Sequence, residues 1–265
     1  MMTTSLTALT AHVWSTEEKR ILVAAARQAP KRWIEDPWTL SFHDDSLDLY
    51  ERMANKHWLR DRGGRARLIA CGAVLANLDC AIRVLGWAPL LDLTSDVTAL
   101  DRVARLKASH RARPTAVDFA RFAALSGRRT KATPSSVAAW GREIAEVGEA
   151  EGVGVRVLTP PHVGALPKVG GQISRKAASA GSWAAFLIGT TTEARGQLLR
   201  AGAVAQRLLL ASTEYGLVGT VFTEPFDAPA VRGTLAGIDG VPGFPQAVVV
   251  VEEPLETPAQ KGRTS

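Results

Sequence analysis

The sequence contains few of the residues that hold a fold together covalently or through metal ions. It has two cysteines and five histidines among 265 residues. Cys71 and Cys80 lie nine positions apart on one predicted helix. This spacing puts them on nearly opposite faces, so we interpret them as buried thiols that cannot bridge each other. No Cys-x-x-Cys or His-x-x-x-His pair occurs, and no metal site is therefore expected.

Long apolar runs are also missing. No run approaches the roughly 20 residues that a membrane-spanning helix needs. The start of the chain lacks a basic stretch followed by an apolar block, so no secretory signal is expected. No paired catalytic carboxylates and no Ser/His set stand out either. We expect a cytoplasmic protein without a membrane partner.

One apolar stretch occurs twice, as Leu68–Gly86 and Leu198–Gly216. The positions of the first copy that are identical in the second are Leu68, Gly72, Ala73, Val74, Leu78, Ala81 and Gly86. Each copy predicts a helix that is buried nearly all round and ends at a glycine suited to the left-handed position after a helix. The early Gly-Ala pair would let another backbone pack closely. We interpret the repeat as a duplicated module fused around two central helices; two unrelated core helices are the alternative.

Positive charge is concentrated in one segment. The net charge is +6, and the stretch from Arg102 to Lys131 carries nine lysines and arginines against a single acid, Asp118. Such a segment attracts phosphate, whether on a nucleotide cofactor or on a nucleic acid. A solvated basic face without a partner is the structural alternative.

The remaining patterns predict alternating helices and strands. Ser15 and Glu18 form a capping box that opens the first helix. Helices are predicted at 15–29, 68–86, 115–125, 133–149, 198–216 and 229–235, and strands at 39–43, 46–50, 89–93, 153–158, 183–188, 217–222 and 246–251. Residues 159–182 are rich in Gly, Pro, Lys and Ser and are interpreted as a flexible connection.

These elements suggest a division of the chain. We expect a flexible N-terminus over 1–14 and a disordered tail over 252–265. Between them, 15–251 forms a single unit of two modules, 15–100 and 133–251. The basic segment joins the two modules.

In this order, the segments resemble the Acg-like branch of the flavin-dependent nitroreductase superfamily, best known from actinobacteria. The resemblance is carried by ILVAAARQAP followed by Pro37-Trp38, DLYERMANK, LIACGAVLANLDCAIRVLGW, SGRRTK, GEAEGVGVRVL, FLIGTTTEARGQLLRAGAVAQRLLLASTEYGLVGTVFTEPFDAPAVRGTL and Pro245-Gln246. It implies an α+β fold with a central mixed β-sheet flanked by helices. The fused chain would form an internally duplicated pseudo-dimer, as a monomer or a homodimer.

The resemblance also implies an activity. NAD(P)H would reduce bound FMN, and the flavin would then reduce a small-molecule electron acceptor. No catalytic side chain is assigned, because the flavin performs the redox chemistry. The cofactor-binding residues implied are Arg128, Arg129, Thr130 and Lys131 for the phosphate, and Lys31, Trp33, Asp36 and Trp38 for the ring or ribityl side. Packing of the two tryptophans at a helix–strand corner and a solvated end for Arg128 and Arg129 are the structural alternatives.

The chain departs from the family pattern at several positions. Lys31, Ile34 and Asp36 stand where the family has Ser, Asn and Gln, and Ala132 stands where a further Arg is expected. The segment 159–182 is shorter than the insertion that covers the flavin in relatives. The second hypothesis is therefore a catalytically degenerate protein of this fold that stores or sequesters flavin or acts through protein contacts. Nucleic-acid binding is the least favoured, because no helix-turn-helix or zinc pattern accompanies the basic segment.

Overall fold

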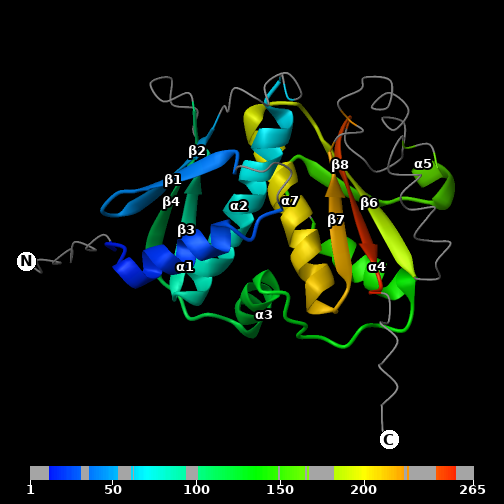
Figure 1. Cartoon of the computed structure of the whole chain (residues 1–265), viewed down its shortest axis with the longest axis horizontal. Coiled ribbons are helices and arrows are strands. Elements are labelled where there is room, and N and C mark those ends of the chain that lie inside the picture. The colour runs from blue at the N-terminus through cyan, green and yellow to red at the C-terminus, as the bar shows by residue number, and fades with distance from the viewer. Residues whose placement is uncertain are drawn as a thin grey trace, which may run out of the picture.

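Two long helices, α2 (Arg65–Val84) and α7 (Arg195–Glu214), pack against each other at the centre, with a four-stranded antiparallel sheet on the outer side of each (Figure 1). This computed structural model describes residues 12–30, 36–52, 61, 63–93, 101–148, 150–164, 166, 182–223, 226 and 243–254. The architecture is α+β, as predicted.

The two halves repeat the same series of elements. The first half contains α1 (Thr16–Ala26), β1 (Trp38–Phe42), β2 (Ser46–Glu51), α2, β3 (Trp87–Asp92) and β4 (Arg102–Arg111). The second contains α4 (Val137–Glu146), β5 (Val153–Val157), α5 (Pro160–Gly164), β6 (Trp183–Thr190), α7, β7 (Val218–Phe222) and β8 (Phe244–Glu252). The strand orders are β1-β2-β4-β3 and β5-β6-β8-β7, and α3 (Ala116–Leu125) lies between the halves in sequence. With α5 set aside, the two series correspond element by element.

The single central mixed sheet expected from the resemblance is wrong for the described residues. Among the described residues, every strand pair is antiparallel, and no strand of one half pairs with a strand of the other. The reason is visible in the order of layers, because the two central helices stand between the sheets and separate their hydrogen-bonding edges (Figure 1).

Most predicted elements lie within a few residues of their expected bounds. Strand β4 was not predicted, because its charges concealed a buried alternation: Ala104, Leu106 and Ala108 face the core, whereas Arg105 and Lys107 face outward.

The predicted helix at 229–235 lies outside the described residues, as does most of 159–182. Trp14 is buried, so packed chain begins before the expected boundary at residue 15. The module limits remain a prediction.

The close approach predicted for the Gly-Ala pairs is confirmed. A Cβ atom on Gly72 would lie 2.0 Å from the carbonyl oxygen of Leu199, and one on Gly202 would lie 1.9 Å from the carbonyl oxygen of Ile69. Only a hydrogen fits at either position. The glycines that follow the two helices, Gly86 and Gly216, adopt φ of 85° and 75°, the left-handed conformation expected of them.

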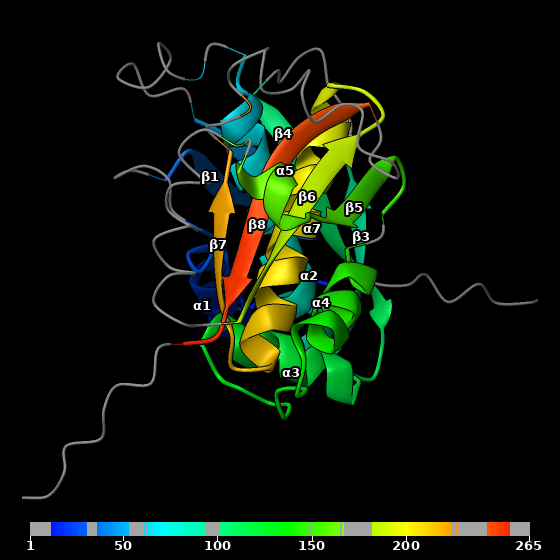
Figure 2. The same ribbon diagram turned by 90° about the vertical axis from the view of Figure 1, so that its right-hand side faces the viewer.

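The two sheets differ on their outer faces. In the second half, α5 lies over the outer face (Figure 2), and apolar side chains cover it. They come from Leu158, Val163, Leu166 and Phe226, which pack on Ala185, Leu187, Val248 and Val250. The outer face of the first sheet carries ion pairs instead. Across the parts of the chain that the structure describes, no helix is both long and apolar enough to cross a bilayer.

Candidate functional site

The structure describes two of the four residues expected beside the flavin ring. Lys31 and Trp33 lie outside the described residues. Asp36 is half-buried and engaged in a polar interaction. Trp38 begins β1, is 9% exposed and packs into the core of the first half. This position agrees with the alternative interpretation of Trp38, in which it packs at a helix–strand corner and does not line the flavin site.

The predicted phosphate loop, Arg128 to Lys131, lies against the C-terminal end of α7. The backbone N–H groups of Thr130 and Lys131 both donate to the carbonyl of Glu214, at 2.9 and 2.8 Å. The hydroxyl of Thr133 donates to the carbonyl of Tyr215 at 2.6 Å. The last carbonyls of a helix have no partner within the helix, so this segment, which we call the α7 strap (residues 128–133), caps α7 from outside.

The side chains of the strap strengthen this attachment. The Lys131 ammonium lies 2.7 Å from a carboxylate oxygen of Glu214 and 4.9 Å from the centre of the Tyr215 ring. The Glu214 side chain is buried, and its charge at a helix C-terminus is unfavourable, so Lys131 compensates it. Tyr215 donates to the Glu143 carboxylate. Burial, followed by this hydrogen bond, raises the pKa of Tyr215 to about 12.

These contacts limit how the strap could hold a phosphate. Two backbone donors and the Lys131 charge are already engaged by Glu214, and the partial negative charge of a helix C-terminus opposes an anion. The Nε of Arg129 donates to the carbonyl of Lys131 at 2.8 Å. What the strap offers a phosphate is therefore the exposed side chains of Arg128, Arg129 and Thr130.

The N-terminal end of α2 is a second polar centre, which the sequence did not indicate. The Asp61 carboxylate accepts the backbone N–H groups of Ala66 and Arg67, both at 3.1 Å, and lies 3.3 Å from the Arg67 guanidinium. A helix N-terminus favours an anion. Here that position is filled by the chain's own carboxylate, so the end of α2 offers no further anion site.

Two arginines at this end join the halves. Arg65 of α2 donates to the carbonyls of Thr223 and Gln246, at 2.6 and 2.7 Å, and so ties the first half to the second sheet. Arg195 of α7 lies 2.6 Å from the Glu51 carboxylate at the end of β2. The contacts run in both directions across the interface, and they fix the upper ends of both central helices (Figure 1).

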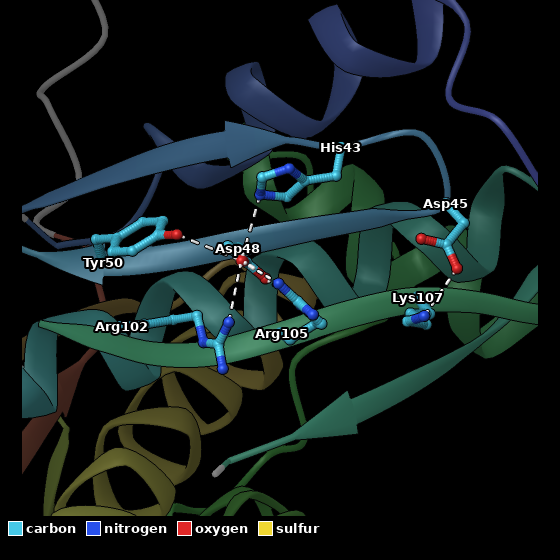
Figure 3. A network of polar contacts seen from close by, with 7 residues as sticks. All are labelled: His43, Asp45, Asp48, Tyr50, Arg102, Arg105 and Lys107. Carbon is cyan, nitrogen blue, oxygen red and sulfur yellow. Dashed lines mark hydrogen bonds and ion pairs between the residues drawn. The ribbon is translucent and has the colours of Figure 1, made fainter. Parts of the chain in front are cut away.

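The outer face of the first sheet carries an ion network centred on Asp48 (Figure 3). Asp48 of β2 is fully buried, and Arg105 of β4, its register partner, binds it with two hydrogen bonds of 2.6 and 2.7 Å. Arg102 lies 3.6 Å and His43 3.3 Å from the same carboxylate. Burial raises the pKa of Asp48, but Arg105, together with Arg102 and His43, outweighs it and lowers the pKa below its usual value.

This network uses much of the basic segment. Lys107 pairs with Asp45 at 2.7 Å, so three of the basic residues of β4 are matched to carboxylates of the neighbouring strand or hairpin. Lys131 is matched to Glu214. Arg105 and Lys107 alternate along β4 and face Asp48 and Asp45 of the β1–β2 hairpin, so each pair joins opposite charges on neighbouring chain segments. Pairing of this kind leaves less free charge for a nucleic acid.

Metal chemistry finds no support in the described ranges, where no group of three or more His, Cys, Asp or Glu side chains could hold an ion. Cys71 and Cys80 are buried and unbridged, as expected.

Comparison with known proteins adds a likeness over nearly the whole chain. Two relatives from Mycobacterium tuberculosis, strains CDC 1551 and H37Rv, are each named "Putative NAD(P)H nitroreductase". Each is 26% identical over 301 aligned positions, which cover 92% of this chain and 87% of the relative. The chain is similar to nitroreductases. No family model matches it. Because the aligned positions outnumber the residues of this chain, the relatives contain segments that it lacks.

Proposed function

We propose that this chain is an FMN-binding, NAD(P)H-dependent oxidoreductase of nitroreductase type. The observation that carries the proposal is the likeness to relatives named as NAD(P)H nitroreductases over 92% of the chain, which takes in both halves and the helix interface between them. The partner is a small-molecule electron acceptor. When bound, FMN would supply the ring that passes a hydride from NAD(P)H to that acceptor.

The proposal includes a duplicated, fused form of the Acg-like type. Gly72 meets Leu199 and Gly202 meets Ile69, and a shift of 130 positions exchanges the two contacts. Such reciprocity is the property of a two-fold dimer interface. The identical strand order of the two sheets supports the same inference. The interface that ordinary nitroreductases form between subunits would thus lie within one chain, acting as a monomer or as a homodimer.

In this proposal, Arg128, Arg129 and the Thr130 hydroxyl hold the FMN phosphate. Lys131 is shared with Glu214 and contributes less. Lys31, Trp33 and Asp36 line the ring or ribityl side, and Trp38 supports them from the core. The role of these residues is to bind and orient the cofactor.

A catalytically degenerate protein is the second candidate. The observation that favours it is the engagement of Lys131 and of two strap N–H groups with Glu214, which removes three donors from any phosphate. The replacement of the family's Ser, Asn and Gln by Lys31, Ile34 and Asp36 adds to this. Each lost hydrogen bond is worth about 1 kcal/mol, so three losses would weaken flavin binding by roughly a hundredfold.

The test compares FMN with riboflavin, which lacks the phosphate. We expect flavin absorbance at about 370 and 450 nm in the purified or reconstituted protein, and tighter binding of FMN than of riboflavin. Arg128→Gln combined with Arg129→Gln should abolish the difference, whereas Arg142→Gln, an exposed arginine of α4, should not. Equal affinities for the two flavins in the unaltered protein would refute the phosphate assignment. A protein that binds flavin but oxidises no NAD(P)H would support the degenerate form.

A further inference from the structure

A groove of about 350 Å³ opens between α2 and α7, beside β3 and the segment that precedes β5. Its volume lies at the lower end of the range for small-molecule pockets, roughly 300–1,000 Å³. Both halves contribute to it: Leu75 and Leu91 come from the first, and Leu199 and Arg207 from the second. None of the residues predicted to bind FMN lines it.

The helix interface explains why the groove exists. Ala76 of α2 and Ala203 of α7 line the groove, and their short side chains leave space between the two helices. Leu75, Leu199 and Leu91 form the apolar walls. Leu91 is 45% exposed, and its backbone is held in place by the pairing of β3 with β4. Its apolar side chain is therefore accessible to a ligand in the groove.

One charge in the groove has no counter-charge. Among the residues that the structure describes, no carboxylate pairs with Arg207. The other arginine of the groove, Arg200, is 3.5 Å from Glu151, whose side chain is 88% exposed, and a surface pair of this kind contributes little. The acidic residues of the groove are engaged: Arg83 holds Asp79 at 2.8 Å, and Asp92 has a partner of its own.

The leucine walls and the unmatched guanidinium together favour a ligand with an apolar body and an anionic group, since the other charged lining residues, Asp79, Asp92 and Arg200, have partners. Apolar walls favour a planar or aliphatic body, and a partly buried guanidinium favours a carboxylate, sulfonate or phosphate, which it can bind with two parallel hydrogen bonds. We propose that this groove is a binding site for a small apolar anion, separate from the flavin site, with Arg207 as the anion-binding group.

The position of the groove fits the duplicated fold. The segment after α4 and the strand β3, which border it, correspond to the segment after α1 and the strand β7 of the other half. Residues 31–38, the expected ring side of the flavin site, follow α1. The groove is therefore the counterpart of that region in the second module. This correspondence rests on the duplication proposed above, whereas the groove and Arg207 do not depend on it.

The experiment titrates the full chain with 1-naphthoate, an apolar carboxylate, and with 1-naphthylmethanol, which has the same body and no charge. Saturable one-to-one binding of naphthoate is expected, at least roughly tenfold tighter than binding of the alcohol, because a charge-assisted hydrogen bond contributes about 1.5–3 kcal/mol. Equal affinities, or no saturation of naphthoate binding below about 1 mM, would overturn the proposal.

Two variants separate charge from shape. Arg207→Gln should weaken naphthoate binding roughly tenfold or more and leave the alcohol unchanged. Leu91→Gln, on the partly exposed wall, should weaken both ligands by a similar factor. Arg113→Gln removes an equal charge at an exposed position outside the groove and should change neither. Naphthoate binding that survives both groove variants would refute the site.

A competition experiment keeps this proposal distinct from the proposed function. Naphthoate binding should be the same with and without FMN, and it should persist in the Arg128→Gln, Arg129→Gln protein. Displacement of naphthoate by FMN would put both ligands in one site and overturn the claim of a separate one. Absence of flavin binding alone would leave the groove unaffected.

Discussion

At the scale of single residues, the contact between α2 and α7 depends on two missing side chains. The carbonyl group of Ile69 occupies the place where a Cβ atom of Gly202 would lie. The carbonyl group of Leu199 occupies the corresponding place beside Gly72. Because the obstructing atoms are backbone, a rotamer change cannot make room for even one methyl group. The helices must separate instead, and the apolar contacts along their length loosen with them.

We therefore expect Gly202→Ala to destabilise the protein by about 3 kcal/mol or more, at or beyond the upper end of ordinary overpacking. The measurement is the free energy of unfolding in urea. Gly196→Ala is the matched control on the same helix, since its Cβ would meet nothing closer than 3.9 Å. Alanine's higher helix propensity should leave that variant unchanged or up to about 1 kcal/mol more stable. Equal stability of the two variants would contradict the close packing.

Asp48 gives a second prediction at this scale. Asp48→Asn removes the carboxylate charge that Arg105 binds, and about 2 kcal/mol of stability should be lost at pH 7. The effect is smaller than the roughly 3–5 kcal/mol of a fully buried pair, because the Arg105 side chain is 34% exposed.

The loss should depend on pH in a defined direction. The pKa of Asp48 is lowered in the folded state, so its contribution is full above the unfolded pKa of about 4 and is lost as the pH falls below that value. The difference in stability between the two proteins should shrink accordingly in unfolding experiments between pH 7 and pH 3. A difference that stays constant across this range would show that the carboxylate charge is not the stabilising group.

At the scale of elements, the α7 strap is the contact most accessible to spectroscopy. Both tyrosines of the chain have raised pKa values: burial and Glu143 raise that of Tyr215 to about 12, and burial and Asp48 raise that of Tyr50. In an alkaline titration, we expect less tyrosinate absorbance at pH 10 than two unperturbed tyrosines would give, since each of those would be half ionised. Glu143→Gln should lower the pKa of Tyr215, so that this side chain ionises at a lower pH.

The same shift predicts a loss of stability in alkali. Tyr215 is neutral in the folded state to a higher pH than in the unfolded state, so its contribution is full below about pH 10 and is lost as the pH rises towards 12. Tyr215→Phe should remove this part of the pH dependence. Normal ionisation of Tyr215 near pH 10 would contradict its burial and its hydrogen bond to Glu143.

The elements also show what the sequence could and could not predict. The capping box of Ser15 and Glu18, the hairpin of β1 and β2 and the glycines after α2 and α7 depend on neighbouring residues, and they were found. Strand β4 was missed because its arginines pair with the Asp48 carboxylate on β2. That carboxylate lies beside them only in the folded chain. The attachment of the α7 strap to the end of α7 was hidden for the same reason, since Thr133 and Tyr215 are 82 positions apart in the sequence.

At the scale of the whole molecule, the chain is smaller than the aligned extent of its relatives. Excluding water protects a reduced cofactor from side reactions, and under the proposed function the segment 159–182 is shorter than the insertion expected to cover the flavin. If the chain turns over, NAD(P)H oxidation in air should therefore continue without an added acceptor and should fall under nitrogen. Bulky acceptors should be reduced about as readily as small ones. Strict dependence on a small acceptor, with no consumption in air, would show that the flavin is covered.

The close contact between α2 and α7 at Gly72 and Gly202 also determines when the core can form during protein synthesis. The apolar face of α2 is completed by Leu199 and Gly202 of α7, so it has no native cover until the ribosome has added about 130 further residues. At roughly 5–20 residues per second, that interval is about 7 to 26 seconds. Throughout this interval, the apolar face of α2 that packs on α7 lacks its native partner and is open to water or to a chaperone. Codon choice between residues 87 and 195 would then alter the yield of folded protein while leaving its sequence unchanged.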